Sequence, residues 1–129
     1  MPEMQRVTVV NDSPEFLEMM AAVLHDAHYP TTVIDGDREN AQELIEAAEP
    51  QILIVDLRLG SEGLHGMDIL RWVRQHPQLS DVPTIICTAD AFGLEQVQAE
   101  LDSLPAVTVL LKPFSIDDLY AALRQLTPA

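Results

Sequence analysis

Five short apolar runs, each followed by a longer stretch of helical periodicity, constrain the fold of this chain more than any other feature. The runs cover residues 6–10, 31–34, 51–55, 84–87 and 107–111. Several of them are apolar without alternation, which is typical of a strand covered on both faces, so a parallel sheet is favoured over an antiparallel one. A strict alternation of strand and helix with right-handed crossovers predicts a doubly wound α/β fold with helices on both faces of the sheet.

The stretches between these runs carry apolar residues at the spacing of one helix face, and each stripe can cover the sheet. The stripes are Phe16, Met19, Met20, Val23, Leu24 and Ala27; Leu44, Ile45 and Ala48; Ile69, Leu70 and Val73, in a helix that begins near Gly66; Leu94, Val97, Leu101 and Leu104; and Ile116, Leu119, Tyr120, Leu123 and Leu126. Ser13 before Pro14 suits a helix start, and Asp37 and Ser115 are candidate caps for the second and fifth helices.

Length and charge limit the function classes. With 129 residues the chain predicts a single domain spanning residues 1–129, and 47% hydrophobic with 22% charged residues is typical of a soluble globular protein. The net charge of −14 argues against direct binding of nucleic acid or an anionic membrane surface, and no apolar stretch approaches membrane-spanning length. We therefore expect a cytoplasmic protein. The single cysteine, Cys87, lies in an apolar run and is expected to be buried.

Polar residues follow the predicted strands at the points where ligands bind in such folds. They are Asn11 and Asp12, Asp56, Thr88 and Lys112. Two carboxylates and an amide supply the hard oxygen ligands that Mg²⁺ prefers, whereas a lysine and a hydroxyl suit phosphoryl oxygens. A carboxylate can itself attack phosphorus to form an acyl phosphate, and Asp56 is the candidate nucleophile.

Four short motifs close successive strands in order. They read Val9-Val10-Asn11-Asp12, Ile52-Leu-Ile-Val-Asp56, Thr88-Ala89 and Lys112-Pro113-Phe114. With these motifs the chain resembles the receiver domain of bacterial response regulators, from about residue 7 to residue 126. The resemblance implies a flavodoxin-like sheet of strand order 2-1-3-4-5 and a role in two-component signalling. Because 129 residues leave no room for a second folded domain, we expect a stand-alone receiver.

The resemblance also implies roles for the strand-end residues. Asp56 would accept a phosphoryl group from a histidine kinase or a histidine phosphotransfer protein. Magnesium would be held by Asp12, Asp56 and the backbone carbonyl of Arg58, with Asn11 acting through water. Thr88, Ala89 and Lys112 would contact the phosphoryl oxygens, and Pro113 is a candidate for a cis peptide bond. An output protein would bind the face formed by the fourth helix, the fifth strand and the fifth helix.

Three features depart from the family pattern. Asn11 replaces the first of two acidic residues, which predicts weaker magnesium binding. Val109 stands where many receivers carry an aromatic residue that changes rotamer on phosphorylation. The loop from Leu57 to Gly66 is about two residues longer than usual, contains three glycines and has Gly60 in place of a proline.

Other interpretations remain open at this point. Asp12 alone could be a helix cap, Thr88 a turn residue, and Lys112 a solvated strand end. Asn11 and Val109 also motivate a pseudo-receiver that binds a partner independently of phosphorylation. A flavodoxin is disfavoured by the acidic segment after the first strand, and a haloacid-dehalogenase-type phosphatase by Arg58 where a second Asp is needed. We expect no enzyme activity beyond assistance of the chain's own phosphorylation and dephosphorylation.

Overall fold

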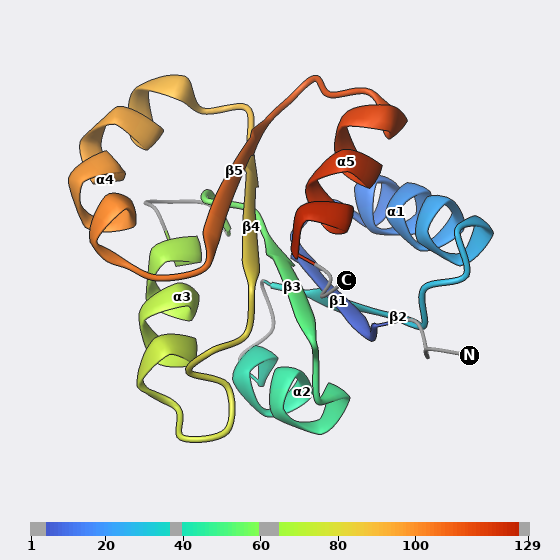
Figure 1. Ribbon diagram of the computed structural model, residues 1–129, viewed down its shortest axis with the longest axis horizontal. Helices are drawn as coiled ribbons and strands as arrows, with labels where there is room; N and C mark the ends of the chain where they lie inside the picture. Colours follow the sequence, from blue (N-terminus) through green and yellow to red (C-terminus); the bar gives the residue numbers. More distant parts are fainter. Residues whose placement is uncertain (1–4, 37–39, 60–64, 127–129) are drawn as a thin grey trace.

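The computed structural model describes residues 5–36, 40–59 and 65–126, in which five strands and five helices alternate along the chain (Figure 1). The strands are β1 (Val7–Asn11), β2 (Thr31–Asp35), β3 (Ile52–Val55), β4 (Thr84–Thr88) and β5 (Val107–Leu111). The helices are α1 (Pro14–Asp26), α2 (Ala41–Ala48), α3 (His65–Gln75), α4 (Ala91–Ser103) and α5 (Ile116–Leu126).

All five strands form one parallel sheet in the order β2-β1-β3-β4-β5, which confirms the predicted fold class and strand order. Val10 of β1 lies opposite Val55 of β3, and Thr88 of β4 lies opposite Leu111 of β5. Because the strands run in one direction, their carboxyl ends meet at a single edge of the sheet. The residues that follow β1, β3, β4 and β5 therefore come together there.

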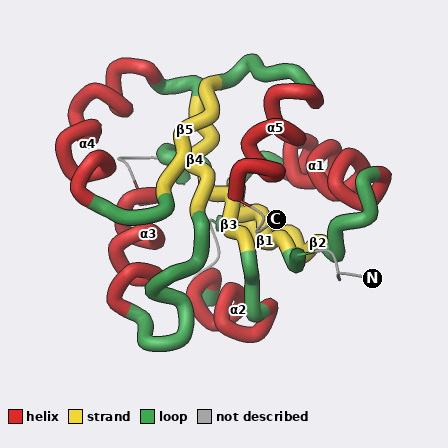
Figure 2. The backbone as a smooth tube through the Cα atoms, in the orientation of Figure 1, coloured by secondary structure: helices red, strands yellow, loops and turns green. Residues whose placement is uncertain are grey.

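Helices cover both faces of the sheet (Figures 1 and 2). α1 and α5 lie side by side on one face, over an apolar cluster that includes Leu24, Ile54 and Leu123. α2, α3 and α4 cover the other face, over a second cluster that includes Leu53 and Leu70. The strands of the sheet centre are buried on both faces, as their unbroken apolar runs predicted.

Cys87 is part of this core, as expected, with 1% of its surface exposed. Burial, which penalises the thiolate, raises the pKa of the Cys87 thiol to about 12. The thiol is therefore protonated at neutral pH. It contributes to packing as a small apolar side chain.

Local capping bonds explain where several helices begin. The Ser13 Oγ accepts the amide of Phe16 at 3.2 Å, and Pro14 occupies the first turn of α1. At α5 the Ser115 Oγ accepts the Asp118 amide at 3.0 Å, as the sequence suggested for Ser115. The residue before α2 is Asn40, whose side chain makes no capping bond. The candidate cap Asp37 lies outside the described residues.

Two arginines of α3 tie this helix to α4 and to the turn after it. The Arg71 guanidinium makes two bonds of 2.7 Å to the Glu100 carboxylate, and this lowers the pKa of Glu100 below its usual value. Arg74 donates to the carbonyls of Pro105 and Ala106, each at 3.2 Å. Charged side chains thus link α3 to α4 and to the turn that follows α4.

Some of the detailed expectations were wrong. Asn11 and Thr88 are the last residues of β1 and β4, whereas the sequence placed them just beyond the strands. Met19 and Ile116 were expected in the apolar stripes that face the sheet, but they are 42% and 52% exposed. Met19 points away because the adjacent Met20 takes the buried face of α1, and Ile116 begins α5 beyond the end of the sheet. Within the described ranges, no helix has the length and apolar character needed to cross a bilayer.

Candidate functional site

Asp56 lies directly after β3 and is surrounded by hydrogen-bond donors. Its Oδ2 accepts the Lys112 Nζ at 2.8 Å and the Asn11 Nδ2 at 3.1 Å, and its Oδ1 accepts the Arg58 amide at 3.0 Å. Only 9% of Asp56 is exposed. The carboxylate is thus anchored through both oxygens, and its negative charge is balanced by an ammonium group in contact with it.

Asn11 contacts Asp56 as a hydrogen-bond donor. Its own Oδ1 accepts the Ser13 amide at 2.8 Å, so the Nδ2 must be the atom that faces Asp56. Only 1% of Asn11 is exposed. An acidic residue in this place would bring two carboxylates together, and they would repel each other. The Asn11 amide instead donates a hydrogen bond to Asp56.

Lys112 is placed by both its backbone and its side chain. Its amide donates to the Thr88 carbonyl at 2.8 Å, which continues the β4–β5 ladder by one residue. The ammonium reaches back to Asp56 and lies 4.1 Å from the centroid of the Phe16 ring. The peptide bond from Lys112 to Pro113, a cis candidate from the sequence, is cis in the structure.

A pocket of about 270 Å³ opens beside Asp56 and offers room for a phosphoryl group. Its walls are Asp56, Arg58, Thr88, Ala89, Asp90 and Lys112. Thr88 is 1% exposed, and its Oγ1 accepts the Asp90 amide at 3.1 Å, leaving the hydroxyl proton for another acceptor. A hollow of about 300 Å³ exists at the opposite edge of the sheet, but none of these residues lines it.

Arg58 and Asp90 form an ion pair at the rim of this pocket. The Asp90 Oδ1 also accepts the Gly93 amide at 2.9 Å and thereby caps α4. The Gly93 amide and, after it, the Arg58 guanidinium lower the pKa of Asp90 below its usual value. Asp90 therefore links Arg58 at the pocket rim to the first turn of α4.

The donor set fits a magnesium ion. Among the residues that the structure describes, no three His, Cys, Asp or Glu side chains converge into a metal cluster. Magnesium does not need one, because it keeps several waters and binds through one or two carboxylates and phosphate oxygens. The carboxylates of Asp12 and Asp56 with the carbonyl of Arg58, all beyond the carboxyl ends of β1 and β3, match that requirement.

Gly66 keeps the backbone near Asp56 in place. Its amide donates to the Leu57 carbonyl at 2.9 Å, and a Cβ on Gly66 would lie only 2.0 Å from the Asp56 carbonyl oxygen. The first turn of α3 can therefore lie this close to Asp56 only with a glycine at position 66. Residues 60–64 of the long loop, Gly60 among them, lie outside the described residues.

Val109 is half-buried on the α4 side of β5, packed against the apolar cluster beneath that helix. A valine in this place has no ring that could move between the core and the surface. The sequence interpretation of Val109 as a switch position without its aromatic residue is consistent with this packing.

The structure adds two residues that sequence reasoning did not place at the site, Asp90 and Phe16, and a side-chain role for Arg58. The sequence assigned Arg58 only a backbone carbonyl, overlooked Asp90, and treated Phe16 as a core residue. The position of Asp90, two residues after Thr88 and just before a predicted helix, was a signal that could have identified it. The contact of Phe16 with Lys112 joins residues from opposite ends of the chain and left no local signal.

Comparisons with known proteins agree with this geometry. The family model described as "Response regulator receiver domain" matches residues 7–124. The DNA-binding response regulator MtrA of Mycolicibacterium smegmatis is 33% identical over 120 residues, which cover 93% of this chain and 49% of that protein. The chain thus spans about half the length of the curated relatives that it matches.

Solved structures show the same fold. The chemotaxis response regulator CheY4 of Vibrio cholerae aligns with a TM-score of 0.80 and 25% identity, covering 96% of this chain and 99% of that one. The response regulator TrrA of Thermotoga maritima, solved in complex with Mg²⁺-BeF, aligns with a TM-score of 0.77 and 22% identity, covering 96% and 100%.

Proposed function

Because the chain belongs to the response regulator receiver domain family, we propose that it accepts a phosphoryl group on Asp56 from a phosphorylated histidine of a kinase or phosphotransfer protein. The observation that carries this proposal is the contact of the Lys112 ammonium with Asp56 beside a pocket of phosphoryl size that Thr88 also lines. In outline, the Asp56 oxygen forms a bond to phosphorus while the phosphorus–nitrogen bond to the histidine breaks. The electron pair of the broken bond returns to the imidazole nitrogen.

The residues of this chain act by position and charge. Lys112 would move from the free carboxylate to a phosphoryl oxygen, and the Thr88 hydroxyl and the Ala89 amide would donate to others. Asp12, Asp56 and the Arg58 carbonyl would hold magnesium, with Asn11 reaching it through water. Bound there, the ion supplies positive charge between the carboxylates and the incoming phosphoryl group. The Mg²⁺-BeF complex of TrrA supports this assignment by analogy of fold.

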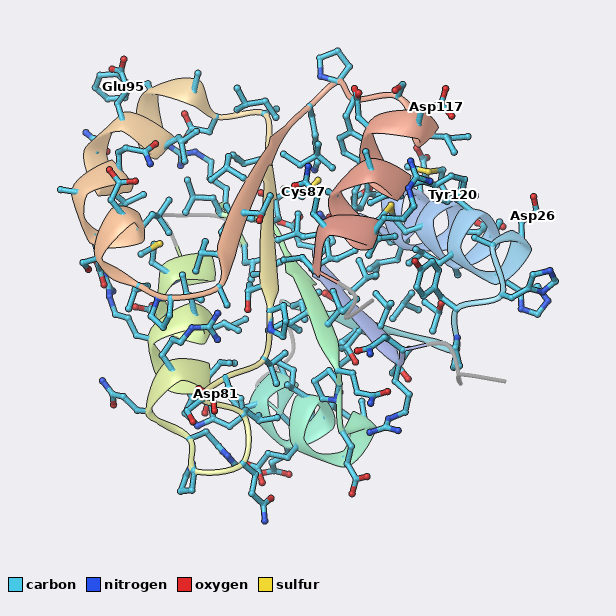
Figure 3. The ribbon with its side chains drawn as sticks, viewed as in Figure 1. Asp26, Asp81, Cys87, Glu95, Asp117 and Tyr120 are labelled. Carbon is cyan, nitrogen blue, oxygen red and sulfur yellow. The ribbon has the colours of Figure 1, made fainter. Side chains whose placement is uncertain are left out.

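We propose the face formed by α4, β5 and α5 for output. Phe92, Leu111 and Ile116 are 69%, 47% and 52% exposed near the carboxyl edge of the sheet. Figure 3 shows Glu95 of α4 and Asp117 of α5 pointing away from the sheet on the outer sides of these helices. The face thus combines apolar side chains with an acidic surround, which suits a protein partner with a complementary basic rim and argues against nucleic acid.

The cellular location, the lack of enzyme activity and the domain organisation also belong to the proposal. A cytoplasmic location and the absence of activity beyond the chain's own phosphorylation and dephosphorylation stay predictions. That the receiver is a single, stand-alone domain also stays a prediction, and relatives such as MtrA are named as DNA-binding regulators about twice as long. The mass of the native polypeptide, measured from its source cells, would decide this last point.

Labelling with a small phosphodonor tests the central claim. Wild type incubated with phosphoramidate and Mg²⁺ should gain one phosphoryl group by intact-mass measurement, and Asp56→Asn should gain none. The acyl phosphate should also be lost on treatment with hydroxylamine, which does not cleave phosphoserine. An unlabelled wild type, or equal labelling of Asp56→Asn, would refute the proposal.

A pseudo-receiver is the second candidate, and one observation favours it. Asn11 donates to Asp56 Oδ2 beside Lys112, where the family pattern has an acidic residue, so the metal site carries one negative charge fewer. In that case the partner should bind wild type and Asp56→Asn with equal affinity. Dependence of binding on phosphorylation would exclude it.

A further inference from the structure

We propose that Phe16 is a positioning residue of the receiver, whose ring holds the Lys112 ammonium in place against Asp56. The inference rests on the proposed function of Asp56 and adds a residue that acts through the lysine. It is motivated by the location of the ammonium between an aromatic face and a carboxylate.

The geometry meets the requirements of a cation–π interaction. The Lys112 Nζ lies 4.1 Å from the Phe16 ring centroid, well inside the distance of about 6 Å at which such contacts act. The same atom is 2.8 Å from the Asp56 Oδ2. The Lys112 side chain is only 23% exposed, so water screens these contacts incompletely.

The ring itself is held from two directions. The Phe16 amide is bonded to the Ser13 Oγ at 3.2 Å, which fixes the residue in the first turn of α1. The Phe114 ring, two residues beyond Lys112, packs edge to face with Phe16 at 6.4 Å and an interplanar angle of 87°. The ring is therefore packed between the first turn of α1 and the segment that follows Lys112.

A fixed ring matters because a lysine is otherwise a poor positioning group. Its four-carbon stem is flexible, and ordering it costs conformational entropy. During phosphoryl transfer the ammonium exchanges its partner from a carboxylate to a phosphoryl oxygen. A neutral ring beside the ammonium limits the positions that it samples without competing for the anion, so the ammonium stays within reach of the incoming phosphoryl oxygen when it leaves the carboxylate.

The alternative is a purely structural role, in which Phe16 only fills space between α1 and the strand ends. A leucine or a fluorinated ring would fill that space as well, so shape and charge have to be separated. Stepwise fluorination of phenylalanine does this, because fluorine withdraws electron density from the ring face and changes the ring size little.

The experiment installs mono-, di- and trifluorinated phenylalanine at position 16 and measures the rate of Asp56 phosphorylation by phosphoramidate with Mg²⁺. We expect the rate to fall stepwise, by about two- to fivefold at the trifluorinated ring, the range given by a surface-type cation–π contact. Phe16→Tyr should retain the wild-type rate. Fluorination of Trp72, on the opposite face of the sheet, is the matched control and should leave the rate unchanged.

Two comparisons decide whether Phe16 acts through Lys112. In a Lys112→Ala background the fluorine series should have no effect on the residual rate. A flat rate across the series with Lys112 present, or an equal fall in the Lys112→Ala background, would overturn the inference.

NMR of the unphosphorylated protein keeps this test independent of the proposed function. The ε-methylene protons of Lys112 should be shifted upfield by the Phe16 ring current in wild type and Phe16→Tyr, and should return to ordinary values in Phe16→Leu. Unshifted protons in wild type would refute the contact. If wild type takes up no phosphoryl group, the proposed function fails and this NMR comparison alone decides the inference.

Discussion

Replacing Asn11 by aspartate should make the stability of the fold depend on magnesium. In wild type the Asn11 amide donates to Asp56 from 3.1 Å while the two residues are 1% and 9% exposed. The substitution keeps the size of the side chain and the acceptor for the Ser13 amide. It replaces the donor that faces Asp56 by a second negatively charged oxygen.

The expected magnitude follows from two contributions. A hydrogen bond to a charged group contributes about 1.5–3 kcal/mol. Two like charges about 4 Å apart repel by about 4 kcal/mol at an effective dielectric constant of about 20. Because the Lys112 ammonium offsets much of the repulsion, we expect Asn11→Asp to lose about 3 kcal/mol of unfolding free energy at pH 7 without metal. Magnesium at 100 times its dissociation constant should restore about 2.7 kcal/mol.

Urea denaturation followed by circular dichroism, in EDTA and again in Mg²⁺, measures both effects. Asn11→Ala is the control, because it removes the hydrogen bond and adds no charge. It should lose about 2 kcal/mol, with no greater gain from Mg²⁺ than wild type. A metal titration should also show tighter Mg²⁺ binding by Asn11→Asp. Equal stability of metal-free Asn11→Asp and wild type, or equal affinity of both proteins for Mg²⁺, would refute the expected charge repulsion.

Three further predictions concern the surroundings of the site. Gly66→Ala should cost about 3 kcal/mol of unfolding free energy in urea denaturation and should reduce Asp56 labelling, because the new methyl group would meet the Asp56 backbone. Unchanged stability and labelling would contradict this contact. The depressed pKa values of Asp90 and Glu100 mean that both carboxylates stabilise α4 above about pH 4 and lose this contribution as the pH falls through their folded pKa values. Amide exchange in α4 should therefore accelerate at acidic pH before amide exchange in β3. An equal acceleration in both elements would argue against this role. Cys87 should resist alkylation by iodoacetamide at pH 8 in the native protein and react once urea unfolds it, whereas rapid native labelling would show that the core opens.

The fold was predictable from the sequence because its signals are local. Unbroken apolar runs marked the strands, a helical period marked the segments between them, and the strand ends identified the edge where Asp56, Thr88 and Lys112 meet. The errors at Met19 and Ile116 arose at helix positions where a one-residue rotation or the end of the sheet decides exposure. Periodicity alone does not resolve either effect.

The side-chain contacts within the site were not predictable, because they join segments that are distant in the sequence. The sequence showed that Asn11 removes a charge, but its role as a donor to Asp56 requires the β1–β3 register and the Ser13 amide that orients it. The ion pair of Arg58 with Asp90 joins side chains 32 residues apart, and both can adopt many other positions in an isolated segment. Such pairs become visible only once the loops after β3 and β4 are placed together.

Because Gly66 is bonded next to the end of β3, the position of the Asp56 acceptor does not depend on the length of the adjoining loop. The Leu57 carbonyl and the Gly66 amide meet at 2.9 Å, so the segment between them starts and ends at one point of the fold. The entropy of closing such a segment grows only with the logarithm of its length, and two extra residues cost about 0.3 kcal/mol. Extra residues in this segment therefore cost the fold little stability, as long as residue 66 stays a glycine and its amide still meets the Leu57 carbonyl.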